Sequence, residues 1–380
     1  MKSKLAHTPI FFTILLLSLC AIGVGCFNYA PTDAPPITPA PIVTPAPIVT
    51  SSALPASTVE WPTNGWQTCT PEEQGMDSQK LAAALDAVKQ TNLTLHSLLV
   101  IRNGCIVSET YFASYPADMK HELYSCTKSF ISTLVGIAID RGYIDSVNRP
   151  VKELLPGRTF ANQDANKDAM TLEDILTMRT GLDWVEGDAS YNNLYMSRDW
   201  AKFVMDEPMV HSPGTFFNYC TGCSHLLSVI VQTATGMNTR DFARAELFGP
   251  LGITNFNWET DSTGIPNGGW GLQLVPRDMA KLGYLFLHNG VWDGKQVVSA
   301  EWVKAATQKH TDTDGDLGYG YQWWTYPALD AYTAQGMYGQ TIFVIPKSNL
   351  IVVTTAAAAD GHTTIFKLIE NYIAPAVHKS

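Results

Sequence analysis

Hydrophobic spacing near the start of the folded part predicts a helix followed by a β-hairpin. Apolar residues recur at helical intervals over 79–89, so one face of this segment is expected to pack on a core. β-rich runs at 98–101 and 106–112 flank the dipeptide Asn103-Gly104. A type I′ turn needs positive φ at both central positions, and Asn-Gly meets this need well, so the two runs are expected to form a hairpin.

A second hairpin is predicted near the C-terminus. Strand-like runs over 341–345 and 350–355 flank turn residues at 346–349, and the pattern over 363–372 is helical. Between the two hairpins, residues 125–310 show mostly helical patterns and loops. The simplest architecture is an α/β (α+β) fold, in which one antiparallel sheet built from both ends of the domain lies beside helices.

The first residues of the chain have the pattern of an export signal. Lys2 and Lys4 precede an apolar run over 10–24, which has the length of a signal-peptide core and is short for a membrane span. Cys26 follows small residues, as in bacterial lipoprotein signals, in which the cysteine is lipidated and becomes the mature N-terminus. Gly23 stands where Leu is usual, so an ordinary signal peptide and an uncleaved anchor stay open as alternatives.

A proline-rich segment follows the export signal. Residues 31–57 carry almost no charge and contain the unit Thr-Pro-Ala-Pro-Ile-Val twice. Dense proline favours polyproline II, so a semi-rigid stalk is expected, with a disordered tether as the alternative. We therefore expect three parts: a signal (1–26), a linker (27–60) and one domain (61–380). The protein is expected to be exported and anchored at a bacterial cell membrane through its N-terminus.

Composition supports a large folded domain without a nucleic-acid role. Hydrophobic residues make up 46% of the chain and charged residues 16%, which allows a sizeable core. The formal net charge of −10 repels phosphate backbones, so no nucleic-acid partner is expected. Seven cysteines are too few for a disulfide scaffold in a chain of this length. A Cys126–Cys220 disulfide and buried free thiols are both open.

The first candidate for chemistry is Ser125, at the head of an apolar helix. Residues 130–139 are apolar on nearly every helical face, so this helix is expected to be buried. Lys128 follows Ser125 by one helical turn and shares its face. Burial lowers the pKa of a lysine, and the resulting neutral amine can activate a serine hydroxyl. The alternative is an N-cap serine followed by a lysine whose head group reaches solvent.

The second candidate is Tyr219, which follows a Pro-Gly turn and precedes an apolar helix expected over 226–231. A phenol at this place can share a proton with Ser125 and Lys128. The alternative is a half-buried core tyrosine.

Four segments together resemble the serine β-lactamase and penicillin-binding-protein superfamily. They keep the family's order and spacing: Ser125-x-x-Lys128, Leu176-Thr177-Met178-Arg179-Thr180-Gly181-Leu182, Pro213-Gly214…Tyr219 and Gly336-Met337-Tyr338-Gly339-Gln340. The likeness is greatest to the class C-like branch, which includes esterases, D-aminopeptidases and 6-aminohexanoate-dimer hydrolases. It covers roughly residues 65–378.

The resemblance implies a fold and a set of roles. The fold would be a five-stranded antiparallel sheet flanked by terminal helices, with an inserted all-helical subdomain and the site between them. Ser125 would attack a carbonyl and form an acyl-enzyme, while Lys128 and Tyr219 would move the proton. The backbone N–H groups of Ser125 and Met337 would form the oxyanion hole.

Two departures from the family pattern bear on the substrate. The third motif, usually Lys or His, then Thr or Ser, then Gly, reads Ala334-Gln335-Gly336 and lacks the cation that would pair with a substrate carboxylate. Thr221 stands where Asn is common, which removes an amide donor. Both changes favour an ester or a neutral amide over a β-lactam or a peptidoglycan stem. The candidate substrate contacts are Thr221, Gln335, Gly336, Tyr338 and Trp184.

The sequence thus predicts an exported serine hydrolase for a small-molecule ester or amide, of the carboxylesterase, D-amino-acid amidase or oligomer-hydrolase type. No cofactor and no metal ion are expected, and the oligomeric state is left open. The alternatives are a β-lactamase or DD-peptidase, a slowly deacylating penicillin-binding sensor, and a purely structural surface protein.

Three other patterns match known sites only in part. The segment 222–225 nearly spells the nucleophile elbow of Ser-His-Asp hydrolases, but Leu226 replaces its final Gly. Cys220 and Cys223 have zinc-like spacing without a second pair. The acidic loop at 312–316 misplaces the Gly of a calcium loop.

Overall fold

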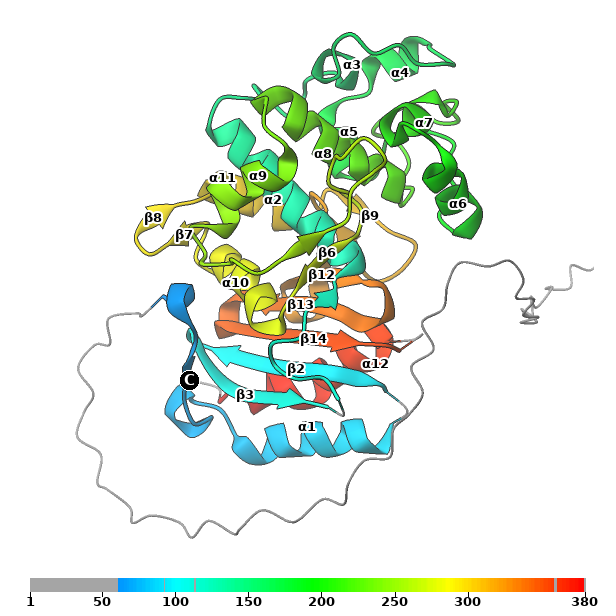
Figure 1. Cartoon of the computed structure of the whole chain (residues 1–380). Coiled ribbons are helices and arrows are strands. Elements are labelled where there is room, and N and C mark those ends of the chain that lie inside the picture. Colours follow the sequence, from blue (N-terminus) through cyan, green and yellow to red (C-terminus); the bar gives the residue numbers. More distant parts are fainter. Residues whose placement is uncertain (1–60, 92, 113, 359–360, 379–380) are drawn as a thin grey trace, which may run out of the picture. The chain divides into compact units, whose positions relative to one another are not determined.

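Nine strands form one sheet in the described part of the chain, which covers residues 61–380 except 92, 113, 359–360 and 379–380 in a computed structural model (Figure 1). The strand order is β1-β3-β2-β14-β13-β12-β11-β10-β9. Five neighbours in this order are mutually antiparallel and have six to eight residues each: β3 (Cys105–Tyr111), β2 (Leu95–Arg102), β14 (Leu350–Ala356), β13 (Gln340–Ile345) and β12 (Ala331–Gly336).

The five-stranded sheet that was expected is thus extended by four short strands. β1 (Gln67–Thr68) pairs in parallel with β3 at one edge. At the other edge, β12 is followed by β11 (Trp324–Tyr326), β10 (Gly318–Tyr319) and β9 (Thr311–Asp312). These strands have two or three residues each, which is too short to show an alternating pattern in the sequence.

Both predicted hairpins are confirmed. Asn103 and Gly104 have φ angles of 51° and 82°, as a type I′ turn requires, and they join β2 to β3. In the second hairpin, Asn349 has a φ of 46° and closes the turn between β13 and β14.

The two faces of the sheet belong to two separate cores. Successive residues of β2 show the alternation: Val100 lies in the core under the terminal helices α1 (Ser78–Gln90) and α12 (Gly361–Leu368), and Ile101 lies in the core of the opposite face. Both terminal helices were predicted, and α12 continues in a π-helical turn over Ile369–Ile373. The proposed catalytic groups described below come from the face on which Ile101 lies and from the adjacent end of β12.

The chain between β3 and β9 is mainly helical. Its helices are α2 (Thr127–Asp140), α3 (Val151–Leu154), α4 (Ala165–Ala169), α5 (Leu172–Leu176), α6 (Asp188–Met196), α7 (Trp200–Asp206), α8 (Thr221–Thr235), α9 (Thr239–Ala243), α10 (Pro276–Leu287) and α11 (Ala300–Thr307). Helices α2 and α8 contact each other at its centre (Figure 1). The insertion is not all-helical, because it also holds short strands: β4 (His121–Glu122), β5 (Asn257–Trp258), β6 (Leu272–Leu274), β7 (Val291–Trp292) and β8 (Lys295–Gln296).

Two disulfide bonds lie in the described residues. Cys69 pairs with Cys105 at the start of β3, across a sequence separation of 36. Cys220 pairs with Cys223 at the start of α8, while Cys126 is buried and free. The alternative in which Cys126 pairs with Cys220 is therefore wrong.

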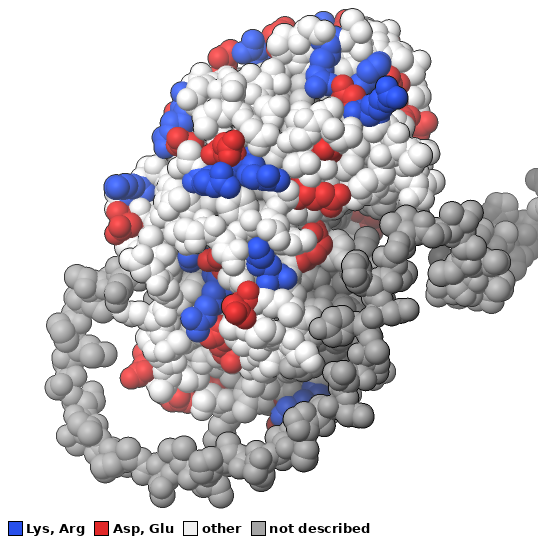
Figure 2. All heavy atoms as spheres, in the orientation of Figure 1, with Lys and Arg blue, Asp and Glu red and all other residues white. Residues whose placement is uncertain are grey.

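Charges of both signs are interspersed on the face shown in Figure 2, and neither sign forms a continuous patch there. Many ion pairs join exposed side chains, such as Lys89 and Asp86 at 2.9 Å. Exposed pairs of this kind contribute about 0–1 kcal/mol each, so the two apolar cores carry most of the stability.

Among the described residues, no helix combines the length and the apolar character needed to cross a bilayer. The predicted signal at 1–26, with Cys26, and the linker at 27–60 lie outside the described residues.

Candidate active site

Ser125 lies in a short 3₁₀ turn, Tyr124–Cys126, that leads directly into α2. The helix is buried on nearly every face, as its apolar sequence predicted, which fixes the position of its first turn. Tyr124 has a φ of 46°, a left-handed conformation that is uncommon for a residue with a side chain. Its N–H donates to Glu122 Oε1 at 2.9 Å, which holds this turn in place.

Lys128 lies one helical turn after Ser125 and is buried, with 1% of its surface exposed. Its Nζ donates to Ser125 Oγ at 2.8 Å and to the Gly269 carbonyl oxygen at 2.9 Å. Burial lowers the pKa of Lys128 to about 8, against the opposing effect of the Glu186 carboxylate. A neutral amine within hydrogen-bond distance of the hydroxyl is thus available near physiological pH.

Tyr219 completes the group that the sequence predicted. Its hydroxyl interacts with the Ser125 side chain, which lowers the phenol pKa slightly against the larger opposing effects, and Lys128 Nζ lies 4.9 Å from the centre of its ring. The ring stacks on Trp324 of β11, with centroids 5.7 Å apart. Burial, followed by the nearby Glu186 charge, raises the pKa of Tyr219 well above its ordinary value, so the phenol keeps its proton and can donate it.

Glu186 is the principal residue that sequence reasoning missed. Its carboxylate accepts hydrogen bonds from Trp184 Nε1 at 2.6 Å and from the Tyr191 hydroxyl at 2.5 Å. It also accepts from the Thr221 N–H at 3.0 Å and from the Thr221 hydroxyl. One acidic residue in a loop carries no motif, so nothing in the sequence singled it out.

Ser125 opens into a pocket of about 240 Å³, lined by Tyr124, Tyr191, Tyr195, Thr221, Trp270 and Met337. Two predicted site residues, Thr221 and Met337, therefore lie beside the nucleophile. The wall is mostly aromatic, with two tyrosines from α6, and it contains no charged side chain. An apolar wall beside a polar reacting group is typical of small-molecule sites.

The charged side chains bonded to the tyrosines of this wall are both negative. Tyr191 donates to Glu186, and the Tyr195 hydroxyl donates to Glu259 Oε1 at 3.0 Å. The buried Lys128 is the cation at the nucleophile. The wall therefore offers no side chain with which a substrate carboxylate can pair.

The third motif approaches the nucleophile from the end of β12. A Cβ added at Gly336, the last residue of β12, would lie 2.1 Å from the Leu123 carbonyl oxygen, so only glycine lets the strand approach the turn before Ser125 this closely. Tyr338, with a φ of 64°, is 42% exposed and meets the Tyr124 ring edge-to-face at 5.4 Å.

Two of the predicted substrate contacts are placed elsewhere. Gln335 lines a separate pocket of about 490 Å³, together with His362 of α12. Trp184 is buried and contacts Glu186 from behind the pocket, so its position suits support of the wall rather than contact with a substrate.

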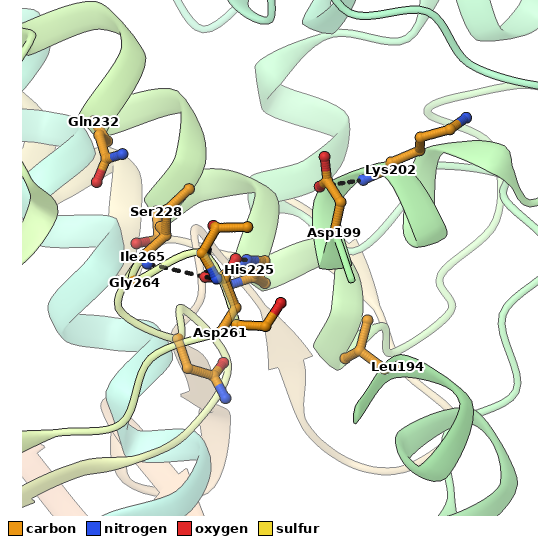
Figure 3. Close-up of polar contacts among 12 residues, drawn as sticks. Leu194, Asp199, Lys202, His225, Ser228, Gln232, Asp261, Gly264 and Ile265 are labelled. Atoms are coloured by element: carbon orange, nitrogen blue, oxygen red, sulfur yellow. Dashed lines mark hydrogen bonds and ion pairs between the residues drawn. The ribbon is translucent and has the colours of Figure 1, made fainter. Parts of the chain in front are cut away.

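A second Ser-His-Asp-like group surrounds the near match to the nucleophile elbow. His225 Nε2 lies 3.2 Å from Asp261 Oδ2, and both side chains are almost fully buried (Figure 3). Ser224 Oγ donates to Gln322 Oε1 at 2.8 Å and makes no hydrogen bond to His225. No substrate can reach a serine that is enclosed in the core, so this group is not a hydrolase site. No cluster of His, Cys, Asp or Glu in the described ranges has the arrangement of a metal site.

Comparison with known proteins identifies the family. The family model described as Beta-lactamase matches residues 74–367. The chain belongs to the beta-lactamase family. The 6-aminohexanoate-dimer hydrolase of Paenarthrobacter ureafaciens is 26% identical to it over 318 residues, covering 77% of this chain and 81% of that protein.

Solved structures of the beta-lactamase family share the fold. A putative 6-aminohexanoate-dimer hydrolase from Bacillus anthracis aligns with a TM-score of 0.66 and 23% identity, over 77% of this chain and 81% of that chain. A family VIII carboxylesterase aligns with a TM-score of 0.66 and 17% identity, over 81% of this chain and 98% of that chain. The resemblance drawn from the motifs is confirmed: the chain is a beta-lactamase-family serine hydrolase.

Proposed function

We propose that this protein is an exported serine hydrolase that forms an acyl-enzyme on Ser125 and cleaves small esters or amides. The observation that carries the proposal is the 2.8 Å hydrogen bond from Lys128 Nζ to Ser125 Oγ, a side chain that lines a pocket. A buried lysine beside a serine hydroxyl is an arrangement that activates a nucleophile.

The proposed steps use three side chains. Ser125 Oγ attacks the substrate carbonyl carbon while its proton passes to neutral Lys128, and the oxyanion is held by the backbone N–H groups of Ser125 and Met337. The leaving group departs with the Tyr219 proton, which Lys128 replaces. Water then attacks the acyl ester and gives one proton to this Lys128–Tyr219 pair, and the acid product leaves as Ser125 Oγ regains its hydrogen.

The charges around the pocket support substrates without a carboxylate on the acyl group. Ala334 occupies the place of the family's cation, while Glu186 and the exposed Glu259 accept hydrogen bonds from the tyrosines of the aromatic wall. A carboxylate there would meet repulsion without a partner, whereas a neutral or amine-bearing acyl group would not. The relatives named as a 6-aminohexanoate-dimer hydrolase and a carboxylesterase support amides and esters as candidates.

Export is supported by the cysteines. Two disulfides in the described residues fit an oxidising compartment, where such bonds persist. The apolar run at 10–24 and Cys26 support a signal of the lipoprotein type and a membrane anchor. Mass spectrometry of the protein purified from its membrane tests this point, since a mature chain that begins after residue 26 without lipid contradicts the anchor.

A fluorophosphonate probe tests the nucleophile. We expect the label on Ser125 in a peptide map, and loss of both label and turnover in Ser125→Ala. The matched control is Ser132→Ala, because Ser132 lies on the same buried helix and its Oγ has no hydrogen-bond partner among the described residues. A label elsewhere removes the proposed function, and a burst of p-nitrophenol without steady turnover would instead identify a slowly deacylating sensor.

Three p-nitrophenyl esters test the substrate class. The 4-(trimethylammonio)butyrate ester, its uncharged 5,5-dimethylhexanoate isostere and the monoester of adipate differ chiefly in the charge at the end of the acyl chain. We expect the adipate monoester to have the lowest kcat/KM, and nitrocefin, which also carries a carboxylate, to be a poor substrate. Efficient cleavage of both anions would show that the loss of the cation at Ala334 does not limit recognition.

A further inference from the structure

A partly buried loop supplies one of the two acceptors of the proposed catalytic lysine. The Gly269 carbonyl oxygen accepts from Lys128 Nζ at 2.9 Å, and Gly269 belongs to the segment 259–271, which returns on itself between β5 and β6. Glu259 N–H donates to the Gly271 carbonyl at 2.9 Å, so the two ends of this loop are joined. The position of the carbonyl therefore depends on how the loop is held.

The tip of the loop is organised by Asp261. Its Oδ1 accepts from Thr263 N–H at 2.8 Å, from the Thr263 hydroxyl at 2.7 Å and from Ile265 N–H at 2.9 Å. Burial alone would raise the pKa of Asp261, but hydrogen bonds, led by that from His225, outweigh it and lower the pKa to about 2. The ionised carboxylate turns its other oxygen toward His225 of α8 (Figure 3).

His225 and Asp261 form the buried polar link from the loop tip to α8. The carboxylate only accepts hydrogen bonds, so the imidazole donates to it from Nε2, and Nδ1 has no partner among the described residues. The imidazole ring also packs against Trp200 of α7, with ring centres 5.3 Å apart. The pair is enclosed in the core, where a hydrogen bond to a charged group is strong.

The other end of the loop lies against the same helix. A Cβ added at Gly268 would lie 2.2 Å from the Ser224 carbonyl oxygen, and one added at Gly269 would lie 2.6 Å from Thr221 Cγ2. Ser224 and Thr221 precede His225 on α8 by one and four residues. The loop is thus held to α8 at two neighbouring points, its tip through His225 and its glycines by direct backbone contact.

We propose that the His225–Asp261 pair is a positioning device for Lys128: it holds the 259–271 loop against α8 so that the Gly269 carbonyl stays on the lysine ammonium. A carbonyl oxygen that accepts from an ammonium stabilises the charged form of the amine. Release of the loop therefore lowers the proton affinity of the lysine. It also leaves Lys128 Nζ less firmly positioned beside Ser125 Oγ. This inference rests on the proposed role of Lys128 as the base.

The effect is measurable because the other groups around Lys128 are few. Ser125 and Cys126 face it from its own turn, Tyr219 from the segment before α8, and Glu186 from the loop before α6. None of these residues belongs to the 259–271 loop, and none makes a hydrogen bond to His225 or Asp261. The direct route from the pair to the lysine therefore runs through the loop, and a longer route runs along α8 to Thr221 and Glu186.

The test is the pH dependence of kcat/KM in the full-length protein, with active sites counted by the fluorophosphonate probe. In His225→Leu, we expect the limb in which activity rises with pH to move to lower pH by about one unit, the scale of one hydrogen bond to a charged group. The plateau should fall by about 10- to 100-fold, as when a catalytic group is misplaced by a remote change. His225→Gln keeps a donor near the same place. It should restore most of the wild-type position of the pH limb and most of the plateau value of kcat/KM.

Two further variants make the outcome decisive. Gly269→Ala moves the carbonyl directly and should show the same shift, so the role of the carbonyl is tested even if His225→Leu does not fold. Thr239→Val removes a buried 2.8 Å hydrogen bond to the Ser228 carbonyl of α8 without touching the loop, and should leave the profile unchanged. A wild-type profile in folded His225→Leu or in Gly269→Ala overturns the inference but not the proposed function, which falls only if Ser125 is not the labelled residue.

Discussion

At the scale of single residues, the chemistry depends on where Lys128 finds its partners. Its two hydrogen-bond acceptors are the Ser125 hydroxyl, from the turn just before α2, and the Gly269 carbonyl, from a distant loop. Burial lowers the pKa of the lysine while the Glu186 charge opposes this effect, which leaves the pKa at about 8. The charged and neutral forms are therefore both populated near physiological pH, so small changes in surroundings alter the fraction of active enzyme.

The first prediction concerns pH. If neutral Lys128 is the base, the protonated form that dominates below its pKa is inactive, and kcat/KM for a p-nitrophenyl ester should rise with pH through a limb centred at about 8. Tyr219 should not limit activity in this range, because its pKa lies well above its ordinary value. A pH–rate profile checks this, and a limb near the ordinary lysine pKa of about 10.4 would contradict it.

The second prediction concerns Glu186. In Glu186→Gln, a single amide oxygen replaces two carboxylate oxygens as the acceptor for four donors, and the new NH₂ group faces donors. The contacts that hold Trp184, Tyr191 and Thr221 together should therefore weaken. Loss of the negative charge should also move the limb of the pH profile to lower pH, since that charge raises the lysine pKa.

We expect kcat/KM of Glu186→Gln to fall by about 10-fold or more, on the scale of one or two lost hydrogen bonds. The control is Asp183→Asn, which removes a nearby exposed charge. Equal effects of the two substitutions would show that only the general charge of this loop matters.

At the scale of elements, the site is formed where the end of β12 meets the start of α2. Gly336 permits the close approach to the Leu123 carbonyl, and Met337 follows it into the pocket wall. The strand therefore sets the place of the backbone N–H that the proposed oxyanion hole requires.

The third prediction follows from this junction. In Gly336→Ala, the added methyl group cannot be accommodated beside a backbone oxygen 2.1 Å away, so the end of β12 must shift. We expect kcat to fall by about 100-fold, the size of the loss of one oxyanion donor, while the melting temperature falls only modestly. Gly315→Ala is the matched control, because nothing lies within 4 Å of its added Cβ. Unchanged turnover in Gly336→Ala would remove this strand end from the mechanism.

The sequence predicted the elements that carry strong local signals. The Asn103-Gly104 hairpin and the apolar helix after Ser125 are confirmed, since turn chemistry and hydrophobic period are local properties. The short strands beyond β12 were missed because two or three residues carry no period. Glu186 and the carbonyl of Gly269 were missed because their roles come only from contacts made across the fold.

At the scale of the whole domain, the strand beside the active site is well separated from the strand that carries a disulfide bond. The Cys69–Cys105 disulfide ties the segment before α1 to β3, while the site lies beside β12. The strands β2, β14 and β13 separate β3 from β12 in the sheet. Stability supplied by the disulfide should therefore be separable from activity.

The fourth prediction tests this separation. Replacing both Cys69 and Cys105 by serine should lower the free energy of unfolding by about 3–4 kcal/mol, because the bond closes a loop of 36 residues in the unfolded chain. Urea unfolding measures this loss, and kcat/KM without urea should stay within about two-fold of the parent value. A large loss of activity in the folded variant would show that the sheet transmits strain from β3 to β12.

Helix α6 supplies two of the pocket's tyrosines, Tyr191 and Tyr195, yet it adds little to the core beyond the buried Leu194. Ser125 and Lys128, in contrast, are held by α2, which is buried almost all round. Selectivity can therefore change through α6 with less effect on reactivity than through α2. A library of variants confined to positions 189–196, with Tyr191 kept because it donates to Glu186, should change which acyl groups are accepted while the nucleophile stays intact, and natural divergence can proceed by the same route.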